Sequence, residues 1–480
     1  MKRITLLLIG ILIIPFFSSA GGIVTNQNQS AAYIRMFVRD ASTDIDAVFF
    51  NPAGLTKLSD GFHFSLNNQY ILQNKYVTSN YTYLTGSPVE YQGEVNVPLF
   101  PGIYGAYKKG KFALSLGINP VGGGGSATFD NGLPSFEIPV SNLVPMLNAQ
   151  LQPVDNYIPG VSNITGYSAD IAFEGSSVYW GYQLNASYEI NEMFSVAIGG
   201  RFISAKNVYT GSLKNVTIDA PEAYGGTQTP GDYLRFIEVQ TGDPTFGAVA
   251  NQLDAQTADF EVDVTQSGSG FAPILGLNIS PNNKLNVAVK YEFAAKIELE
   301  NDTKIDGLGM FPDGEKVRND MPAMFSAGFD YQITDKLSVA SGFHMYFDKN
   351  ANYGKKLNGV YVDNDELIDR NSTEFALGLE YDVSEKLLLS IGYLHTQTGV
   401  TEDYQTDLSY SNHSNSIGLG GGYAIKPGIK LNLGIGYTIY NDARKIYDAS
   451  DPLGGTITTK EGYDKDNLFI ALGLDFKFGK

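Results

Sequence analysis

The sequence predicts an all-β fold: a closed, 14-stranded antiparallel transmembrane β-barrel with an N-terminal hatch, or plug, inside its lumen. Three observations lead to this fold class. A strand–turn–strand cassette recurs six times, its strands are apolar at every second position, and its short turns alternate with long polar connections. Barrels that cross an outer membrane have this asymmetry, with short turns on one side and long loops on the other.

Residues 1–20 have the pattern of an export signal peptide. Lys2 and Arg3 form a charged start, Ile4–Phe17 an apolar stretch, and Ser18–Ala20 a small-residue cleavage site. An uncleaved anchor is the alternative, but the apolar stretch is shorter than the ~20 residues that a spanning helix needs. We therefore expect cleavage after Ala20.

Residues 21–60 are too irregular for strands and are expected to form the hatch, because a barrel of this width needs filling. Residues 61–480 are expected to form the transmembrane barrel with long extracellular loops. Its first strand covers about Phe62–Leu72 and its last strand Asn467–Phe478. Six pairs of strands lie between them, so the count is fourteen and both chain ends fall on the short-turn side.

The six pairs surround short turns. Three turns lie near residues 108–111, 190–193 and 281–284, and three lie within the cassettes 331–347, 381–397 and 423–440. A tyrosine precedes five of the six turns, at Tyr107, Tyr188, Tyr331, Tyr381 and Tyr423. Rings at one depth form an interfacial girdle, so we expect these tyrosines to mark one edge of the membrane.

Two long connections, 119–175 and 207–261, are expected to be extracellular loops, although either has room for an extra hairpin. Thr245–Thr257 has apolar residues at helical spacing and is expected to form a short helix. Acidic clusters at 363–366 and 464–466 are expected to lie in solvated connections. The formal net charge of −18 argues against nucleic acid as a partner.

Nothing in the sequence indicates an enzyme, a metal site or a cofactor. There is no cysteine, and the four histidines lack the spacing of metal ligands. Ser341 and His344 are the nearest candidates for a nucleophile and its base. Alternation places Ser341 toward lipid and His344 toward the lumen, so the two side chains cannot meet.

The segment before the first strand carries the motif Asn51-Pro52-Ala53 within the stretch Asp44–Leu55. In this position the motif resembles the signature of the FadL/TodX family of outer-membrane channels for hydrophobic substrates. Residues 21–30 and 39–43 are also similar to hatch sequences of that family. The resemblance covers the mature chain in architecture, but only about 35 residues in motif.

The resemblance implies a passive transporter in the outer membrane for long-chain fatty acids or other hydrophobic molecules, such as aromatic hydrocarbons. It implies a hatch at Asn51, Pro52 and Ala53, and a kinked third strand through which the substrate leaves sideways into outer-membrane lipid. The matching strand, Lys111–Asn119, runs into Pro120, Gly122 and Gly123, residues that interrupt pairing. These residues, with Asn119, mark either a lateral opening or the entrance to a loop.

A carboxylate head group in the lumen would need a cation, and alternation places Arg201 and Lys290 inward. Inward acids at Glu292, Asp330 and Glu380 favour a structural salt network as the alternative. We expect a monomer. The alternative function is a structural or adhesive outer-membrane barrel that acts through its long surface loops.

Overall fold

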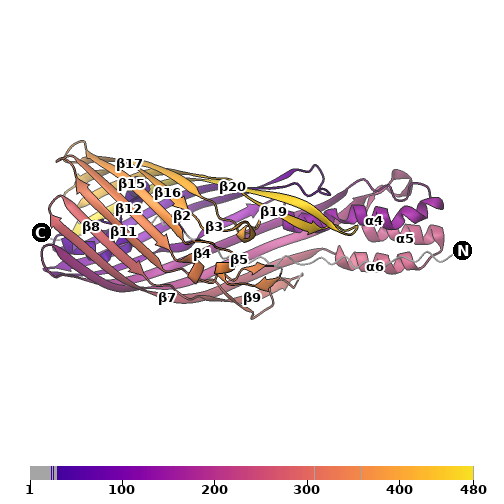
Figure 1. The fold of residues 1–480 in the computed structure, drawn as a ribbon, viewed down its shortest axis with the longest axis horizontal. Coiled ribbons are helices and arrows are strands. Elements are labelled where there is room, and N and C mark those ends of the chain that lie inside the picture. Colours follow the sequence, from indigo (N-terminus) through magenta and orange to yellow (C-terminus); the bar gives the residue numbers. More distant parts are fainter. Residues whose placement is uncertain (1–22, 24, 26–29, 308, 358, 479–480) are drawn as a thin grey trace.

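A computed structural model describes residues 23, 25, 30–307, 309–357 and 359–478, so the expected signal peptide lies outside the described residues. The chain forms the predicted closed barrel of fourteen antiparallel strands (Figure 1). The wall strands are β1 (Gly61–Ser79), β2 (Val89–Lys109), β3 (Phe112–Phe129), β4 (Tyr167–Glu189), β5 (Phe194–Asp219), β7 (Phe260–Asn282), β8 (Leu285–Glu292), β11 (Met324–Gln332), β12 (Leu337–Tyr346), β15 (Ser372–Asp382), β16 (Leu387–Gln397), β17 (Ser414–Lys426), β18 (Ile429–Tyr440) and β20 (Thr456–Phe478).

The barrel closes where the first wall strand meets the last. β1 pairs with β20 without a register shift, from Phe62 opposite Phe478 to Ser79 opposite Glu461. The predicted first and last strands are therefore correct as partners, but both extend further toward the long-loop end. The acidic cluster at 464–466 lies within β20 and not in a connection, because β1 supplies pairing partners for those residues.

The long-loop end carries the elements that lie between or extend the wall strands. β9 (Glu298–Asp306), β10 (Lys316–Arg318) and β19 (Ala443–Ser450) extend the wall, and the short strands are β6 (Thr227–Gln228), β13 (Lys356–Leu357) and β14 (Val360–Tyr361). The helices are α3 (Pro134–Ser141), α4 (Leu143–Leu151), α5 (Pro230–Thr241) and α6 (Thr245–Gln256), with 3-10 turns η2 (Gln152–Asn156), η3 (Glu222–Tyr224), η4 (Asp348–Asn350), η5 (Asn364–Glu366) and η6 (Glu402–Tyr404). The expected helix at 245–257 is thus confirmed as α6. β3 and β4 extend into the two ends of the first connection, 119–175, and β5 extends into the start of the second, 207–261. The helices α3 to α6 and irregular segments fill most of the remainder.

Within the part of the chain that the structure describes, no helix is both long and apolar enough to cross a membrane.

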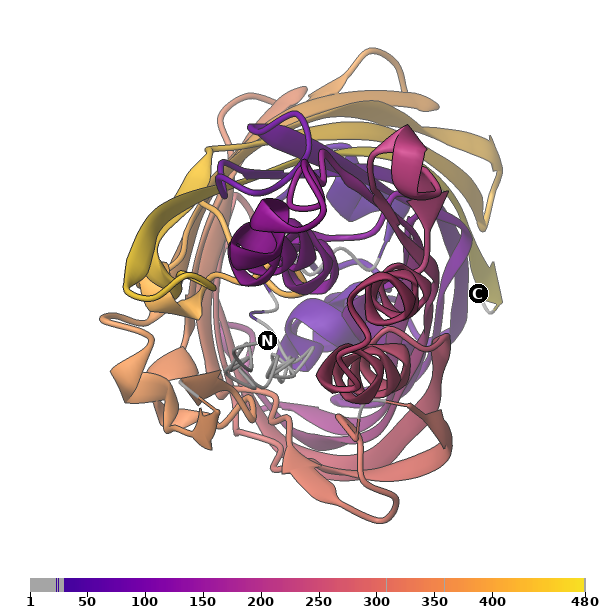
Figure 2. The ribbon, with the colours of Figure 1, turned by 90° about the vertical axis from the view of Figure 1, so that its right-hand side faces the viewer.

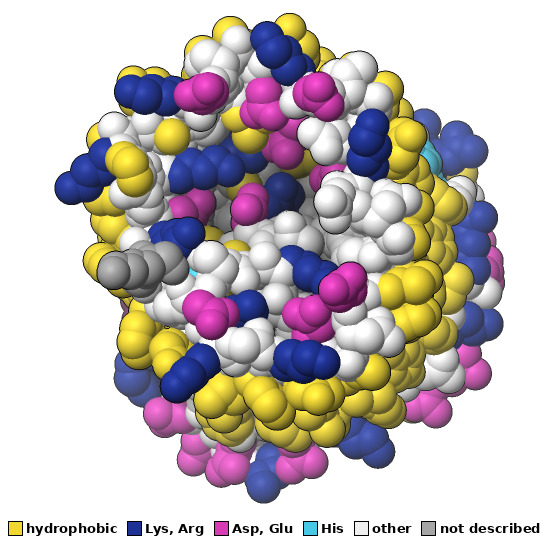
Figure 3. Space-filling model, turned by 90° about the vertical axis from the view of Figure 1, so that its left-hand side faces the viewer, with side chains coloured by type: hydrophobic (Ala, Val, Ile, Leu, Met, Phe, Trp, Pro, Cys, Tyr) yellow, Lys and Arg dark blue, Asp and Glu magenta, His cyan; other side chains and the backbone are white. Residues whose placement is uncertain are grey.

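The wall follows the predicted alternation of faces. In β20, Ile470 and Leu472 are about half exposed on the outer surface, whereas Phe469 and Ala471 are buried against the lumen. The turn tyrosines all lie on the outer surface. Figure 3 shows the short-turn end, where charged side chains surround the rim and apolar side chains cover the flank behind it. This arrangement matches a wall that faces lipid on one side and polar groups on the other.

The lumen is filled by the N-terminal segment, residues 30–60, which lies inside the ring of strands (Figure 2). It contains α1 (Ala31–Ile34), α2 (Ala47–Phe50) and the 3-10 helix η1 (Pro52–Lys57). Helices of four to six residues are not stable alone, so packing against the wall must hold them. Small wall residues permit that packing: a Cβ at Gly392 would lie 1.8 Å from the carbonyl oxygen of Met36.

Candidate functional site

The Asn51-Pro52-Ala53 motif fastens the N-terminal segment to one side of the wall. The Asn51 Oδ1 accepts a hydrogen bond from the Ala53 N–H (3.2 Å) and caps η1, while its Nδ2 donates to the Leu277 carbonyl of β7 (2.9 Å). The Pro52 carbonyl accepts from the Ser187 hydroxyl of β4 (2.7 Å). The motif therefore ends one helical turn, begins the next and anchors both on β4 and β7, the two strands that flank β5.

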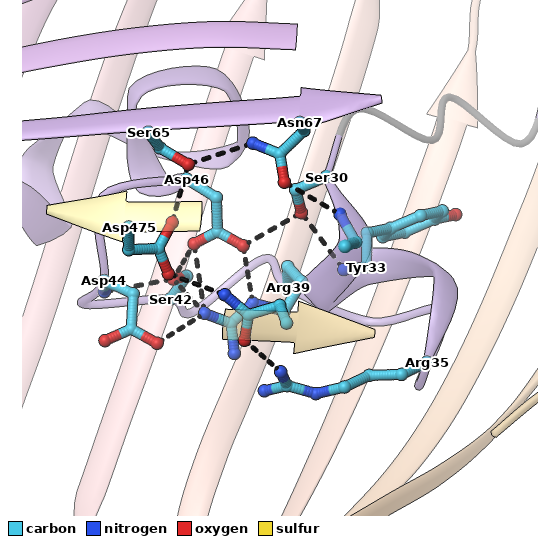
Figure 4. Close-up of polar contacts among 12 residues, drawn as sticks. Ser30, Tyr33, Arg35, Arg39, Ser42, Asp44, Asp46, Ser65, Asn67 and Asp475 are labelled. Atoms are coloured by element: carbon cyan, nitrogen blue, oxygen red, sulfur yellow. Dashed lines mark hydrogen bonds and ion pairs between the residues drawn. The ribbon is translucent and has the colours of Figure 1, made fainter. Parts of the chain in front are cut away.

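Charged side chains fold the rest of the segment onto itself (Figure 4). The Arg39 guanidinium pairs with Asp46 (2.8 Å) and Asp44 (2.9 Å), and the Ser30 hydroxyl donates to Asp46 (3.2 Å). Arg35 reaches the wall and pairs with Glu380 of β15 (2.6 Å). Arg35, Arg39 and Asp46 are buried, so their ion pairs offset a desolvation cost that would be large for an isolated charge. The Asp44 side chain is about half exposed.

His344 joins the segment to a second part of the wall, at β12 and β15. Its Nε2 lies 2.7 Å from the Asp40 carboxylate of the segment, and its Nδ1 lies 2.8 Å from the Glu374 carboxylate of β15. A carboxylate only accepts hydrogen bonds, so both ring nitrogens donate and the side chain is an imidazolium. The sequence placed His344 in the lumen correctly. It gave no sign of this role, because Asp40 and Glu374 are distant in sequence.

The predicted head-group residues, Arg201 and Lys290, do face inward, but both are already engaged. Arg201 pairs with Glu292 (2.5 Å), and the Lys290 ammonium lies 3.5 Å from the same carboxylate. Lys290 also donates to the Phe49 carbonyl (3.2 Å), and both cations lie over the Phe49 ring. This arrangement supports the structural salt network as the role of the two residues.

The third strand does not end at Asn119 but continues as β3 to Phe129. Its pairing with β2 stops at Ile118 opposite Ile103 and resumes only at Ala127 opposite Val95. Pro120 has no N–H to donate, and Gly123 adopts a left-handed backbone (φ 84°). The wall therefore has an interrupted seam between residues 96–102 of β2 and 119–126 of β3, at the sequence that was expected to break pairing.

Two side chains flank this seam. A Cβ at Gly125 of β3 would lie 2.2 Å from Cγ2 of Val97, so the Val97 side chain packs directly on Gly125. On the other edge of β3, a Cβ at Gly123 would lie 2.1 Å from the Ser177 carbonyl of β4. The β4 backbone leaves no room for a side chain at Gly123, and the Val97 side chain leaves none at Gly125. Val97 fills the seam from the β2 side.

A cavity of about 330 Å³ lies in the lumen beside the seam. Val95, Gly123 and Gly125 form its border with the seam, and most of the remaining lining is aromatic, aliphatic or small: Ala127, Phe129, Phe136, Ala172, Phe173, Tyr179, Tyr209, Leu213, Phe260, Val262, Met310, Phe311 and Met321. Pockets of this size and composition are typical binding sites for small hydrophobic ligands.

Two lysines also line this cavity. Lys75 of β1 and Lys465 of β20 are direct cross-strand partners, and their ammonium groups lie 5.9 Å and 5.4 Å from the centre of the Tyr410 ring. Lys465 is also 4.5 Å from the centre of the Tyr440 ring. Among the described residues, neither ammonium forms an ion pair with a carboxylate. Asp320 and Asp407 line the cavity too, but Asp320 binds Arg318 and Asp407 accepts a hydrogen bond from the Ser135 N–H.

The sequence did not identify these lysines because the predicted strands stopped short of them. Alternation was nevertheless sufficient to find them. Continuing the inward positions Gln69, Ile71 and Gln73 along β1 leads to Lys75, and continuing backwards from Phe469 and Asn467 along β20 leads to Lys465.

Comparisons with known proteins point to one family. The family model described as outer membrane protein transport protein (OMPP1/FadL/TodX) matches residues 168–478. No curated protein matches the chain. The solved structure of a Pseudomonas aeruginosa FadL homologue is 14% identical, with a TM-score of 0.62, and the match covers 96% of this chain and 100% of that chain.

Two toluene transporters have similar folds. The Pseudomonas putida transporter TodX is 12% identical with a TM-score of 0.56, and the match covers 96% of this chain and 100% of that chain. The Ralstonia pickettii transporter TbuX is 14% identical with a TM-score of 0.51, covering 95% of this chain and 100% of that chain. At these identities the likeness demonstrates the shared fold alone.

Proposed function

Since this chain belongs to the OMPP1/FadL/TodX family of outer membrane transport proteins, we propose that it is a passive channel for hydrophobic molecules that carry an anionic head group. Long-chain fatty acids are the substrate class that fits best. The observation that carries this proposal is the pair Lys75 and Lys465, which line a cavity rich in aromatic and aliphatic residues and form no ion pair among the described residues.

The lysine pair supports a charged head group over a neutral hydrocarbon. Two like charges directly opposite each other on neighbouring strands destabilise the sheet, and an anion between them removes that cost. A carboxylate there would receive charge-assisted hydrogen bonds, while the aromatic and aliphatic lining would hold its alkyl chain. Lys75 and Lys465 take the role first considered for Arg201 and Lys290, because those two residues already bind Glu292.

The N-terminal segment acts as the hatch. Asn51, Pro52 and Ala53 anchor it on β4 and β7, and the Asp40–His344–Glu374 contact anchors it on β12 and β15. An apolar chain that moved straight through the lumen would have to break these contacts and the charged network around Arg39. The axial route is therefore closed while the hatch stays docked.

The substrate instead leaves sideways through the interrupted seam, at Asn119, Pro120, Gly122 and Gly123. Each CH₂ group gains about 0.8 kcal/mol on transfer out of water, so release into the aqueous periplasm is strongly uphill for a long chain. Transfer from an apolar cavity into lipid is nearly neutral. The cavity lining already includes Gly123 and Gly125 of the seam, so the path from site to lipid is short.

The test has two parts. Mass spectrometry of the purified protein should find fatty acids in the lumen, and cells in which the gene is deleted should take up labelled oleate more slowly than complemented cells. Uptake that is unchanged for both oleate and toluene would contradict a transport role and favour the surface-loop alternative. If complementation speeds the uptake of toluene but not of oleate, the protein is a channel, but its substrates do not need an anionic head group.

A further inference from the structure

Asn68 of β1 is a polar residue on the surface of the barrel that faces lipid. Its neighbours on the same face, Phe62 and Leu66, are 61% and 43% exposed, and Leu472 lies directly opposite it on β20. An unpaired amide among such residues is costly, because lipid offers no hydrogen-bond partner. The position therefore requires partners for both ends of the amide.

Both partners come from the backbone of β2. The Asn68 Nδ2 donates to the Pro98 carbonyl (3.0 Å), and its Oδ1 accepts from the Phe100 N–H (3.0 Å). These groups lie at a bulge: Gln69 pairs with Phe100, Ile71 pairs with Val97, and two residues of β2 are set against one of β1. Bulges bend a strand and remove backbone groups from the ladder. Asn68 satisfies the two groups that flank the bulge.

The bulge borders the interrupted seam. Pro98 and Leu99 lie within residues 96–102, the stretch of β2 that has no partner on β3, and Leu99 is 70% exposed to the outside. Val97, the next residue along, packs on Gly125 across the seam. The side chain of Asn68 therefore sits behind the part of β2 that determines how far Val97 reaches toward β3.

We propose that Asn68 is a positioning residue that holds the β2 edge of the lateral opening in a bulged shape. The proposal rests on the lateral exit described above. When both hydrogen bonds are present, β2 stays bent away from β3, so that only the Val97 side chain stands between the cavity and lipid. Without these hydrogen bonds the bulge has no fixed shape. The β2 backbone can then form other hydrogen bonds, which obstruct the exit.

The test compares Asn68→Leu with the wild type, using the full-length protein in outer membranes. Leucine suits the lipid-facing position, so the barrel should still fold and show heat-modifiable migration on a gel. The loss of each hydrogen bond corresponds to about a fivefold change in an equilibrium, so oleate uptake should fall at least about fivefold. Oleate binding to the purified protein should not change. Asn68→Asp keeps the hydrogen-bond acceptor, so its oleate uptake should lie between that of the wild type and that of Asn68→Leu.

A spectroscopic measurement separates positioning from general destabilisation. The chain has no cysteine, so a single spin label at Leu99→Cys reports on the bulge, and its mobility should rise in the Asn68→Leu background. The matched control is Ser204→Leu, an exposed polar residue on β5, which should alter neither uptake nor label mobility. The proposal is overturned if both Asn68 variants take up oleate as fast as the wild type. It is also overturned if the mobility of the label is the same with and without Asn68→Leu. Absence of oleate uptake in the wild type would instead refute the proposed function.

Discussion

Lys75 and Lys465 face each other across the β1–β20 pair that closes the barrel, and the Tyr410 ring lies near both ammonium groups. The closure of the barrel therefore brings together two residues that are far apart in sequence. It places their charges in a cavity whose lining is otherwise mostly apolar. A cavity that combines cations with an apolar lining distinguishes an amphiphile from a plain hydrocarbon.

Replacing both lysines with glutamine should weaken oleate binding much more than toluene binding. A hydrogen bond to a charged group contributes about 1.5–3 kcal/mol, so the dissociation constant for oleate should rise by about tenfold or more. Equilibrium binding to the purified protein measures this change. Lys304→Gln, at an exposed lysine of β9, is the control and should leave both constants unchanged. Equal losses for the two ligands would contradict a head-group role.

Substituting His344 with glutamine should loosen the hatch without unfolding the barrel. The change leaves the Asp40 and Glu374 carboxylates close together without the cation between them. Removing one partner of a buried pair typically costs about 3–5 kcal/mol. Residues 30–60 should become sensitive to protease, and single-channel conductance should rise.

His395→Gln provides the comparison, because His395 of β16 contacts Asn415 and does not contact the hatch. The triple variant with Asp40→Asn, His344→Gln and Glu374→Gln should regain part of the protease resistance, since it removes the repulsion. Identical cleavage of the hatch in wild type and His344→Gln would show that the contact does not hold it.

The loop between β12 and β15 should pack more firmly as the pH rises from 7 toward 10.5. Burial, reinforced by the positive charge of Lys445, lowers the pKa of Lys355 from 10.5 to about 7. Between these values the unfolded loop binds a proton that the packed loop does not, so raising the pH favours packing. Below pH 7 the dependence disappears, because both states are protonated.

Limited proteolysis of residues 347–371 across this pH range measures the effect. Lys355→Met keeps the length of the side chain over the Tyr404 ring but cannot titrate, so it should flatten the profile. A wild-type profile that matches the Lys355→Met profile would contradict the assignment to Lys355.

The wall was predictable because its information is local. Short turns, alternation and recurring tyrosines each lie within about 20 residues, and together they determined fourteen strands and the pairing of the first with the last. The extent of the strands was harder to predict. Polar residues such as Lys75 and Asp464 suggest a loop when one strand is considered alone. They belong to strands because β1 and β20 pair with each other through these positions.

The site depends on contacts between distant residues, which one sequence does not reveal. His344 of β12 meets Asp40 because the hatch lies inside the closed barrel. Asn68 meets Phe100 because β1 and β2 pair in a register with a bulge, which the residue types alone do not determine. The break in the third strand was visible as Pro120 and Gly123, since these residue types disrupt pairing wherever they occur. Its continuation to Phe129 was not, because β4 supports the far half of the strand.

A reversible closure of the seam is the most direct test of lateral exit from the lumen into lipid. A Cβ at Gly125 would lie 3.6 Å from the Val97 Cβ, within the range of about 3.5–4.5 Å that a disulfide needs. In this cysteine-free chain, Val97→Cys with Gly125→Cys should form one bond across the opening. We expect oxidation to abolish oleate uptake, reductant to restore it, and oleate binding in the lumen to persist in both states. Wild-type uptake by the fully cross-linked protein would contradict lateral exit through this seam.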